Sequence, residues 1–437
     1  MVKSQILNIT KFFCKDHIYF PAAVWLGSRI LIFIAMFLIT PKLVLANQEV
    51  TNFGFGTFNV WDSIHYQMIV TSGYEFVNDG KQHNIAFFPL FPVSIWIFMK
   101  LGLSFEKAGV LINNLAFGGA LYFLYFWLKK HYGTKTAQWA TSVLSFSPMS
   151  IFTGIIYTEG LYLFLSIAAL RAFDNKQYGG TALWGAMATA TRPTGMALIP
   201  AFLLAAWKQN KPPIAYIAGL VATTGLLLFS LYCAITFNDP LAFIAAQKGW
   251  RTSLGFDWQG WLNMLLQIPF GSNWSDGWAA NKNGGVLDIW HPLIFSIIVI
   301  SYFFVRMFRN YSHPAIINFI IYAGYVAVIV VLILADQQII NNLLNVFMVL
   351  GSSYLLWRFR QQLTPVMVIY GFCGVGLLLA SGATISLSRL AYGIVPLNIA
   401  IGVWLSRFPR QAYLILGLFM ILLIKLAIGF AQHHWVG

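Results

Sequence analysis

The polar segment 59–92 carries the acidic side chain with the clearest potential for chemistry. It reads NVWDSIHYQMIVTSGYEFVNDGKQHNIAFFPLFP and comes soon after the first long apolar segment of the chain. Asp62 follows Trp61 and precedes a run of hydrogen-bonding side chains, Ser63, His65 and Tyr66. A carboxylate next to apolar segments of membrane-spanning length is costly unless it is paired, solvated or functional. Asp62 is therefore the first candidate for a catalytic group.

Further polar side chains stand at the predicted outer ends of apolar segments. These candidates are Asn84, Glu159, Arg192, Lys248, Arg251 and Arg389. A lone carboxylate facing several cations suits the transfer of a sugar from a lipid phosphate, because a base can take the proton of the acceptor hydroxyl while the cations hold the phosphate. Arginine fits this task because its planar guanidinium donates parallel hydrogen bonds and stays charged near lipid.

The composition predicts a polytopic membrane protein. Of the 437 residues, 59% are hydrophobic and 9% are charged, with a mean hydropathy of +0.71. A water-soluble globular domain typically has about 25% charged residues. The net charge is +14, and the basic residues gather in short clusters between apolar runs, such as Lys129 with Lys130 or Arg407 with Arg410. This is the positive-inside pattern of membrane proteins and not a nucleic-acid-binding patch.

The apolar runs predict about 13 transmembrane helices within one domain covering residues 1–437. Runs of spanning or nearly spanning length lie at 20–40, 107–128, 137–153, 157–173, 213–236, 290–305, 315–335, 343–357, 364–380, 390–405 and 411–430. The stretch 180–206 adds two short limbs, broken at the segment TRPTG (191–195), where Pro193 lacks a backbone donor and Gly195 permits a tight bend. We interpret 20–40 as an uncleaved first span and 86–101 as a half-inserted segment.

Placing the basic clusters in the cytoplasm puts two large loops, 41–85 and 237–289, on the outer side. The short turns near 154–160, 191–195, 336–341 and 384–390 fall on the same side, as does the C-terminal His433-His434-Trp435. Most of the acidic residues also lie there. This clustering indicates a wet outer cavity in which carboxylates act.

The sequence carries no motif of a bound cofactor. It contains no P-loop, no Rossmann glycine run and no H-E-x-x-H motif. Its three cysteines, Cys14, Cys233 and Cys373, lack the spacing of a metal site or a disulfide framework. We therefore expect no cofactor, and a lipid-phosphate sugar would itself be a substrate.

Several blocks give the chain a resemblance to the PIG-V family. In order they are WDSIHY, NIAFFPLFP, SP…YTEG, TRPTG, DPLAFIAAQKGWR and SRLAYGIVPL, and they extend over roughly residues 20–405. The family comprises GPI mannosyltransferases and their prokaryotic relatives, so the resemblance implies the GT-C glycosyltransferase fold, a catalytic acid in the first outer loop and a polyprenyl-phosphate sugar donor. Asp62 matches the expected base. The family's late motif has Arg directly followed by Tyr, whereas Arg389 and Tyr392 are separated here, so the resemblance carries over to Arg389 more than to Tyr392.

Each candidate residue also has a structural interpretation. Asp62 could cap a helix beginning at Ser63, and His65 could be an ordinary interfacial histidine. Glu159 could form a purely structural ion pair with Arg192, and arginines near span ends often extend to lipid headgroups. The tryptophans of the second loop fit an interfacial aromatic belt; they are Trp250, Trp258, Trp261, Trp274 and Trp278.

The sequence thus predicts an inverting mannosyltransferase that moves a sugar from a polyprenyl-phosphate donor to a lipid-linked or membrane-associated acceptor on the outer or lumenal face. Asp62 would be the general base. The donor phosphate would be held by Arg389, Arg192, His65 and Lys248, with support from Trp61, Tyr66, Asn84, Glu159 and Arg251. The membrane would be the plasma membrane of a prokaryote or the endoplasmic reticulum membrane of a eukaryote. The alternatives are a flippase or transporter of lipid-linked sugars and a non-catalytic subunit of a glycosylation complex.

Overall fold

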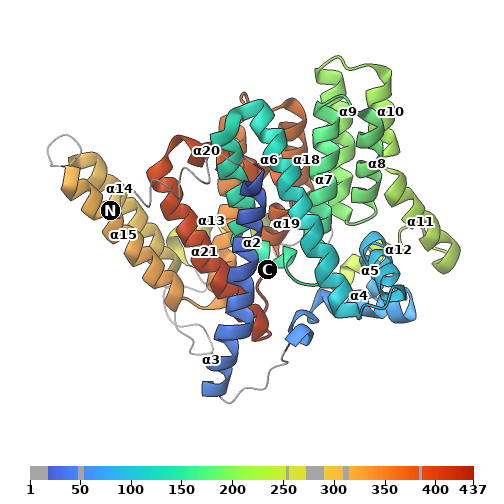
Figure 1. Cartoon of the computed structure of the whole chain (residues 1–437), viewed down its shortest axis with the longest axis horizontal. Helices are drawn as coiled ribbons and strands as arrows, with labels where there is room; N and C mark the ends of the chain where they lie inside the picture. Colours follow the sequence, from blue (N-terminus) through green and yellow to red (C-terminus); the bar gives the residue numbers. More distant parts are fainter. Residues whose placement is uncertain (1–17, 48–53, 252–254, 272–289, 309–313, 383–385) are drawn as a thin grey trace.

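The protein is a bundle of α-helices in this computed structural model, which describes residues 18–47, 54–251, 255–271, 290–308, 314–382 and 386–437 (Figure 1). These residues form no β-strand, and one isolated bridge joins Gly255 to Ser381. The predicted all-α fold is therefore confirmed. Trp274 and Trp278, which the sequence assigned to an aromatic belt, lie outside the described residues.

The first apolar run folds as one rod that is longer than predicted. Helix α2 (Tyr19–Phe33), the π-helix η1 (Ile34–Ile39) and α3 (Thr40–Asn47) follow each other without a break, so the rod extends into the predicted outer loop 41–85. Pro41 explains the wide turn, because proline has no backbone N–H and its ring would clash with a carbonyl of the preceding helical turn.

Helix α6 (Phe105–Phe146) is a hairpin of two limbs, which correspond to the predicted runs 107–128 and 137–153. Gly133 breaks it with φ 80° and ψ 169°, a conformation that favours glycine. Both limbs contact α2 at the same level: the side chain of Arg29 donates to Asn114 Oδ1 (3.2 Å), and Ser145 Oγ lies 3.0 Å from Ser28 Oγ. A straight helix would separate residues 114 and 145 by roughly 46 Å, so the chain must turn back.

The predicted break at 191–195 is observed. Helix α7 (Glu159–Asp174) is followed by α8 (Tyr178–Thr189), the 3₁₀ turn η5 (Pro193–Ala197) and α9 (Leu198–Lys208). A Cβ on Gly195 would come within 2.8 Å of the Ala188 carbonyl oxygen, so a larger residue would force the two limbs apart.

The two predicted outer loops contain short helices. The first holds η2 (Gly54–Phe58), α4 (Asp62–Ser72) and η3 (Asn84–Ala86), and leads into α5 (Leu90–Lys100). The second holds α12 (Ala242–Ala245), η6 (Ala246–Gly249) and α13 (Trp258–Phe270). Helix α5 has 11 residues, a length of about 17 Å against about 30 Å for the hydrocarbon core. Its length thus fits the predicted half-inserted segment.

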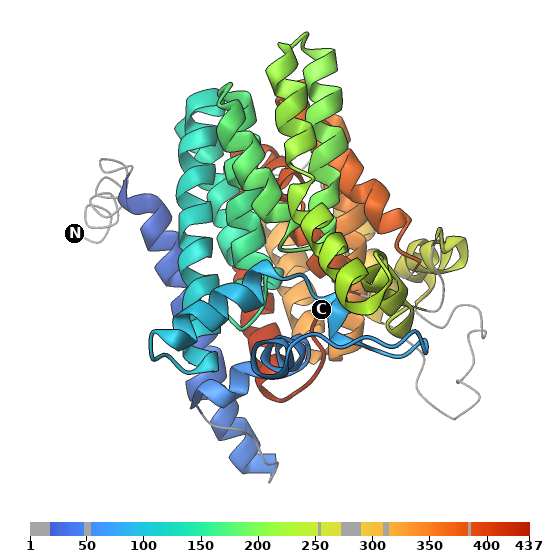
Figure 2. The same ribbon diagram turned by 90° about the vertical axis from the view of Figure 1, so that its right-hand side faces the viewer.

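The remaining elements complete the bundle. They are η4 (Pro148–Thr153), α10 (Pro213–Val221), α11 (Thr224–Phe237), α14 (Trp290–Phe308), α15 (Pro314–Leu334), α16 (Gln337–Asn345), η8 (Val346–Gly351), α17 (Ser352–Phe359), α18 (Pro365–Leu379), α19 (Leu387–Tyr392), α20 (Val395–Arg407) and α21 (Pro409–Ala431). Figure 2 shows the long helices side by side. The chain after α21 comes close to the start of α4, because the rings of Trp435 and Trp61 are 5.5 Å apart.

Seven helical segments of the described chain are long and apolar enough to cross a membrane. They are Tyr19–Leu43, Phe105–Phe146, Pro213–Phe237, Trp290–Met307, Ile316–Leu334, Gln337–Phe359 and Pro409–Ala431. The predicted class of integral membrane protein is thereby confirmed. The count of about 13 spans is not confirmed, because some runs predicted to span form shorter helices, such as α18 with 15 residues and α20 with 13.

The basic turns gather at one end of the bundle. Lys130 Nζ donates to Asn175 Oδ1 (2.8 Å), and Thr364 Oγ1 donates to Asp174 Oδ2 (2.9 Å). These bonds hold together three turns: the one after the first limb of α6, the one after α7 and the one after α17. The start of α7, with Glu159, and the start of η5, next to Arg192, lie at the other end of the bundle from these turns. The candidate acidic and basic side chains meet there.

Candidate active site

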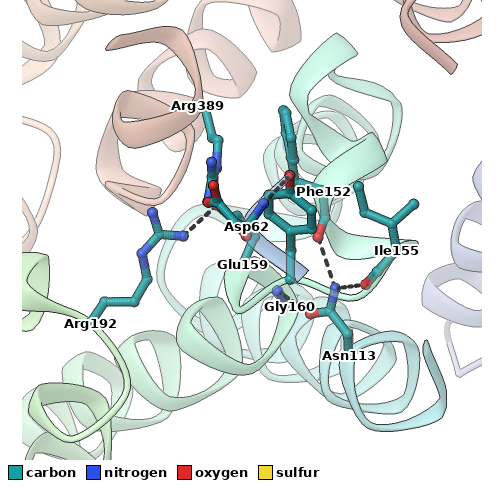
Figure 3. A network of polar contacts seen from close by, with 9 residues as sticks. Asp62, Asn113, Phe152, Ile155, Glu159, Gly160, Arg192 and Arg389 are labelled. Atoms are coloured by element: carbon teal, nitrogen blue, oxygen red, sulfur yellow. Dashed lines mark hydrogen bonds and ion pairs between the residues drawn. The ribbon is translucent and has the colours of Figure 1, made fainter. Parts of the chain in front are cut away.

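Four charged side chains from four separate segments form one connected network (Figure 3). Arg389 in α19 donates from Nε to Glu159 Oε1 (2.5 Å) and from Nη2 to Asp62 Oδ2 (2.7 Å). Arg192, just before η5, pairs through Nη1 with the same Glu159 oxygen. The predicted pairing of Glu159 with Arg192 is therefore observed, and Arg389 joins it to Asp62. We call Asp62, Glu159, Arg192 and Arg389 the charged quartet.

Burial makes the charged quartet mutually dependent. The side chain of Glu159 is 0% exposed and those of Arg192 and Arg389 are 10% and 8% exposed, whereas that of Asp62 is 19% exposed. Two carboxylates balance two guanidinium groups, so no member is left as a buried charge without a partner, which would be strongly destabilising. Asp62 is the more accessible of the two acids and is the one that a substrate hydroxyl could reach.

Aromatic rings hold the Arg389 guanidinium from several sides. Its central carbon lies 4.6 Å from the ring centre of Tyr157 and 4.9 Å from that of Phe152. Trp435, from the segment after α21, supplies a third ring at 5.9 Å. Such cation–π contacts favour the charged guanidinium and fix its direction.

The backbone around Asp62 differs from the capping interpretation. Helix α4 begins at Asp62 itself, and Trp61 is the capping residue. Trp61 has φ 59° and ψ −123°, a region that bulky side chains rarely adopt and that costs about 1–3 kcal/mol. The Asp62 backbone N–H donates to the Tyr157 hydroxyl (3.4 Å). The Asp62 carboxylate is thus directed to Arg389 by a strained turn.

Asn113, which was not among the candidates predicted from the sequence, braces the loop that carries Glu159. Its Nδ2 donates to the carbonyl oxygens of Phe152 (2.8 Å) and Ile155 (2.7 Å), and its Oδ1 accepts from the Gly160 N–H (2.7 Å). A Cβ on Gly160 would lie 2.3 Å from the Asn113 carbonyl oxygen, so only glycine fits beside Glu159.

Arg29 and Asn114 support the same loop from α2 and α6. The Arg29 guanidinium donates to Asn114 Oδ1 (3.2 Å) and to the Ser150 carbonyl oxygen (3.4 Å), and it lies 5.0 Å from the Phe117 ring centre. Arg29 was not among the candidates predicted from the sequence. Its position within the apolar run 20–40 could have identified it, because charged groups inside spans are costly and usually have a partner or a role.

His65 and Tyr66 lie one turn along α4 in an aromatic cluster instead of the charged quartet. The His65 ring stacks on Phe87 at 4.7 Å and meets Trp250 edge-on at 5.6 Å. Burial lowers the pKa of His65, while the nearby Asp62 carboxylate opposes that shift. Tyr66 is buried, and its ring meets those of Phe87 and Phe91 edge-on at 5.2 and 5.1 Å.

The other candidates hold loops or lie apart from the quartet. Asn84 accepts from the Glu75 N–H (2.8 Å) and donates to the Gly73 carbonyl (3.1 Å), which ties together the loop after α4. Arg251 donates to the Ser381 carbonyl oxygen (2.5 Å). Lys248 is exposed in η6, and the Tyr392 hydroxyl donates to the Leu144 carbonyl (2.8 Å).

The geometry separates two chemical tasks. Asp62 has a carboxylate at the edge of the buried region, suited to take a proton from a hydroxyl. Arg389 and Arg192 converge on Glu159, so both guanidinium groups are aimed at one anionic position. Such a pair can stabilise a phosphate as its charge increases.

Comparisons with known proteins identify the family of the chain. A family model described as mannosyltransferase (PIG-V) matches residues 31–354. GPI alpha-1,6-mannosyltransferase 2 of Cricetulus griseus is 26% identical over 315 residues, which are 63% of this chain and 56% of that protein. The Homo sapiens protein of the same name is 24% identical over 317 residues, again 63% and 56% of the two chains. The chain thus matches little more than half the length of these relatives.

Two solved structures are similar at low identity. The apo oligosaccharyltransferase of Archaeoglobus fulgidus has a TM-score of 0.49 and 12% identity, with 96% of this chain and 57% of that chain covered. ArnT of Cupriavidus metallidurans bound to undecaprenyl phosphate has a TM-score of 0.37 and 14% identity, with 93% and 76% covered. Both scores are below 0.5, so the assignment rests on the sequence family instead. Because the family model matches most of its residues, this chain belongs to the PIG-V family of mannosyltransferases.

Proposed function

We propose that this protein is an inverting, metal-independent glycosyltransferase that moves a mannosyl group from a polyprenyl phosphate to a lipid-linked or membrane-associated acceptor. The observation that carries the proposal is the position of Arg389, whose guanidinium bonds Asp62 and Glu159 at once, with Arg192 on the same Glu159 oxygen. Membership of a mannosyltransferase family supports the choice of sugar.

In the proposed reaction Asp62 takes the proton of the acceptor hydroxyl. The hydroxyl oxygen attacks the anomeric carbon of the donor, and the bond from that carbon to the phosphate oxygen breaks. One displacement inverts the anomeric centre. The released polyprenyl phosphate gains negative charge, which Arg389 and Arg192 stabilise more strongly in the transition state than in the bound donor.

Glu159 has a different role from Asp62 in this proposal. Its side chain is 0% exposed and carries two arginine contacts, so an acceptor hydroxyl would have no access to it. It keeps the two guanidinium groups charged, adjacent and fixed in direction. Removing Asp62 should therefore abolish proton transfer, whereas removing Glu159 should disorganise the phosphate site.

We place the site on the outer face of a prokaryotic plasma membrane or the lumenal face of the endoplasmic reticulum. The argument is the charge distribution: basic turns such as Lys130 lie together at one end of the bundle and the charged quartet lies at the other. Basic turns favour the cytoplasmic side of a membrane.

The decisive test is a transfer assay with purified protein in lipid, radiolabelled polyprenyl-phosphate mannose and a host membrane-lipid extract. Asp62→Asn is compared with Asp79→Asn, an acid of the same loop that bonds His83 (2.8 Å) away from the quartet. Label should enter a new acceptor with native protein and Asp79→Asn but not with Asp62→Asn. Equal transfer by Asp62→Asn would eliminate Asp62 as the base. Movement of intact donor across the bilayer without transfer by any protein would indicate a flippase.

A further inference from the structure

The segment after α21 turns back and places Trp435 next to Arg389 of the charged quartet. Helix α21 ends with two turn hydrogen bonds, from the His434 N–H to the Gly429 carbonyl (2.9 Å) and from the His433 N–H to the Phe430 carbonyl (3.0 Å). His433 adopts φ 62° at this point. This is the reversal that ends many helices and redirects the chain. It turns residues 434–437 away from the helix axis and toward Asp62.

Contacts on both sides of Trp435 fix this segment in place. The Trp435 carbonyl accepts a hydrogen bond from Asn341 Nδ2 of α16 (3.1 Å). The next residue, Val436, is 0% exposed within the main apolar core. The backbone on either side of the indole is thus anchored, so the ring has a defined position.

The indole of Trp435 lies between a strained residue and a charged one. It meets the Trp61 ring edge-on at 5.5 Å and the Phe152 ring at 6.5 Å, and its centre is 5.9 Å from the Arg389 guanidinium. Phe152 and Tyr157 are fully buried, whereas Trp435 is only partly buried. Trp435 is therefore the member of the three-ring set around Arg389 that lies nearest to solvent.

Packing in the apolar core accounts for the burial of Val436 but not for the position of the Trp435 indole. A tail that only covered apolar surface would bury its largest side chain in the core, yet the core receives Val436 while the indole faces a guanidinium. Both Arg389 and Trp435 also lie beyond residues 31–354, the part matched by the family model.

We propose that Trp435 is a positioning residue that holds the Arg389 guanidinium in the direction required to bind the donor phosphate. The ring adds a cation–π contact to those of Phe152 and Tyr157, and it packs against Trp61, the residue that precedes Asp62. A phosphate that enters the quartet meets Arg389 already oriented. The inference rests on the proposed function, because it assigns the phosphate of the sugar donor to Arg389.

The test uses the full chain in lipid nanodiscs with Trp435→Leu, Trp435→Phe and the control Trp207→Leu. Trp207 is 71% exposed at the far end of α9 from Arg192. Three quantities are measured: the dissociation constant of polyprenyl monophosphate, the KM and kcat for the labelled donor, and the thermal unfolding temperature. Losing one cation–π face should weaken lipid-phosphate binding and raise KM roughly 3- to 30-fold in Trp435→Leu.

Phenylalanine keeps an aromatic face, so Trp435→Phe should recover most of the binding lost in Trp435→Leu, and Trp207→Leu should match native protein. Native binding by Trp435→Leu would overturn the inference, as would equal losses in Trp435→Leu and Trp435→Phe, which would indicate a packing role. If Trp435 controls lipid-phosphate binding but native protein transfers no mannose, the proposed mannosyl transfer fails, while the role of Trp435 in lipid-phosphate binding stands. If native protein binds no lipid phosphate, both fail.

Discussion

Replacing Asp62 with asparagine should tighten the binding of polyprenyl phosphate while it removes turnover. In the structure Arg389 Nη2 is bonded to Asp62 Oδ2 at 2.7 Å, so an incoming phosphate must compete with this carboxylate for the guanidinium. Asparagine has nearly the same shape but no charge. Arg389 would keep its bond to Glu159 and offer its other nitrogen to the phosphate. Binding and catalysis should therefore change in opposite directions.

The size of the effect follows from the burial of the pair. A hydrogen bond between charged groups contributes about 1.5–3 kcal/mol. Asp62 is 19% exposed, and solvent screening reduces the pair to about 1–2 kcal/mol. Since about 1.4 kcal/mol corresponds to a tenfold change, the dissociation constant should fall about 5- to 30-fold. Loss of a general base should lower kcat by about 10²- to 10⁴-fold.

The assay is competition between polyprenyl monophosphate and radiolabelled donor on purified protein in nanodiscs. Asp79→Asn provides the matched control, because it removes one negative charge from the same loop without touching Arg389. Weaker or unchanged binding by Asp62→Asn, with native binding by Asp79→Asn, would refute the competition between carboxylate and phosphate. It would mean that Asp62 and the phosphate contact Arg389 together.

Four further results are expected. Glu159→Gln leaves two guanidinium groups without their shared anion, so the free energy of unfolding should fall by about 3–5 kcal/mol; an unchanged unfolding temperature would contradict the buried pairing. Asn113→Leu leaves the buried Phe152 carbonyl and the Gly160 N–H without this partner, at about 1–3 kcal/mol each, and native stability in that variant would show that the brace is dispensable. Burial lowers the pKa of His65, so the folded state prefers the neutral ring; stability is fully present above the unfolded value of about 6.5 and should fall as pH drops below it, a dependence that His65→Phe should reduce. Transfer should persist in a metal chelator, because Arg192 and Arg389 supply the positive charge, and its loss with recovery on adding a divalent cation would refute metal independence.

Features set by local sequence were predictable. The break at Pro193 and Gly195 follows from residues that cannot continue a helix, and it is observed at η5. The pairing of Glu159 with Arg192 could be proposed because both lie at predicted helix ends on the same side of the membrane. The helix break depends on neighbouring residues along the chain, and the ion pair depends on both residues lying on one side of the membrane.

The contacts made by Arg389 could not be predicted in this way. Its bonds to Asp62 and Glu159 join segments that are distant in the sequence, and they depend on how the helices pack. The same holds for Asn113, an ordinary polar residue in a helix until the loop bearing Glu159 packs against it. Sequence periodicity places a residue on a helix but not beside its tertiary partners.

The charged quartet also supports the interpretation of residues 86–101 as a half-inserted segment and not a full span. Between Asp62 and Glu159 the chain passes through α5 and then both limbs of α6, which cross in opposite directions. If α5 crossed the membrane as well, the number of crossings would be odd, and the two carboxylates would lie on opposite faces. Arg389 bonds both of them, at 2.7 and 2.5 Å. We therefore expect an even number of crossings, with α5 entering and leaving on one face, so that Asp62 and Arg389 meet on the same side of the membrane.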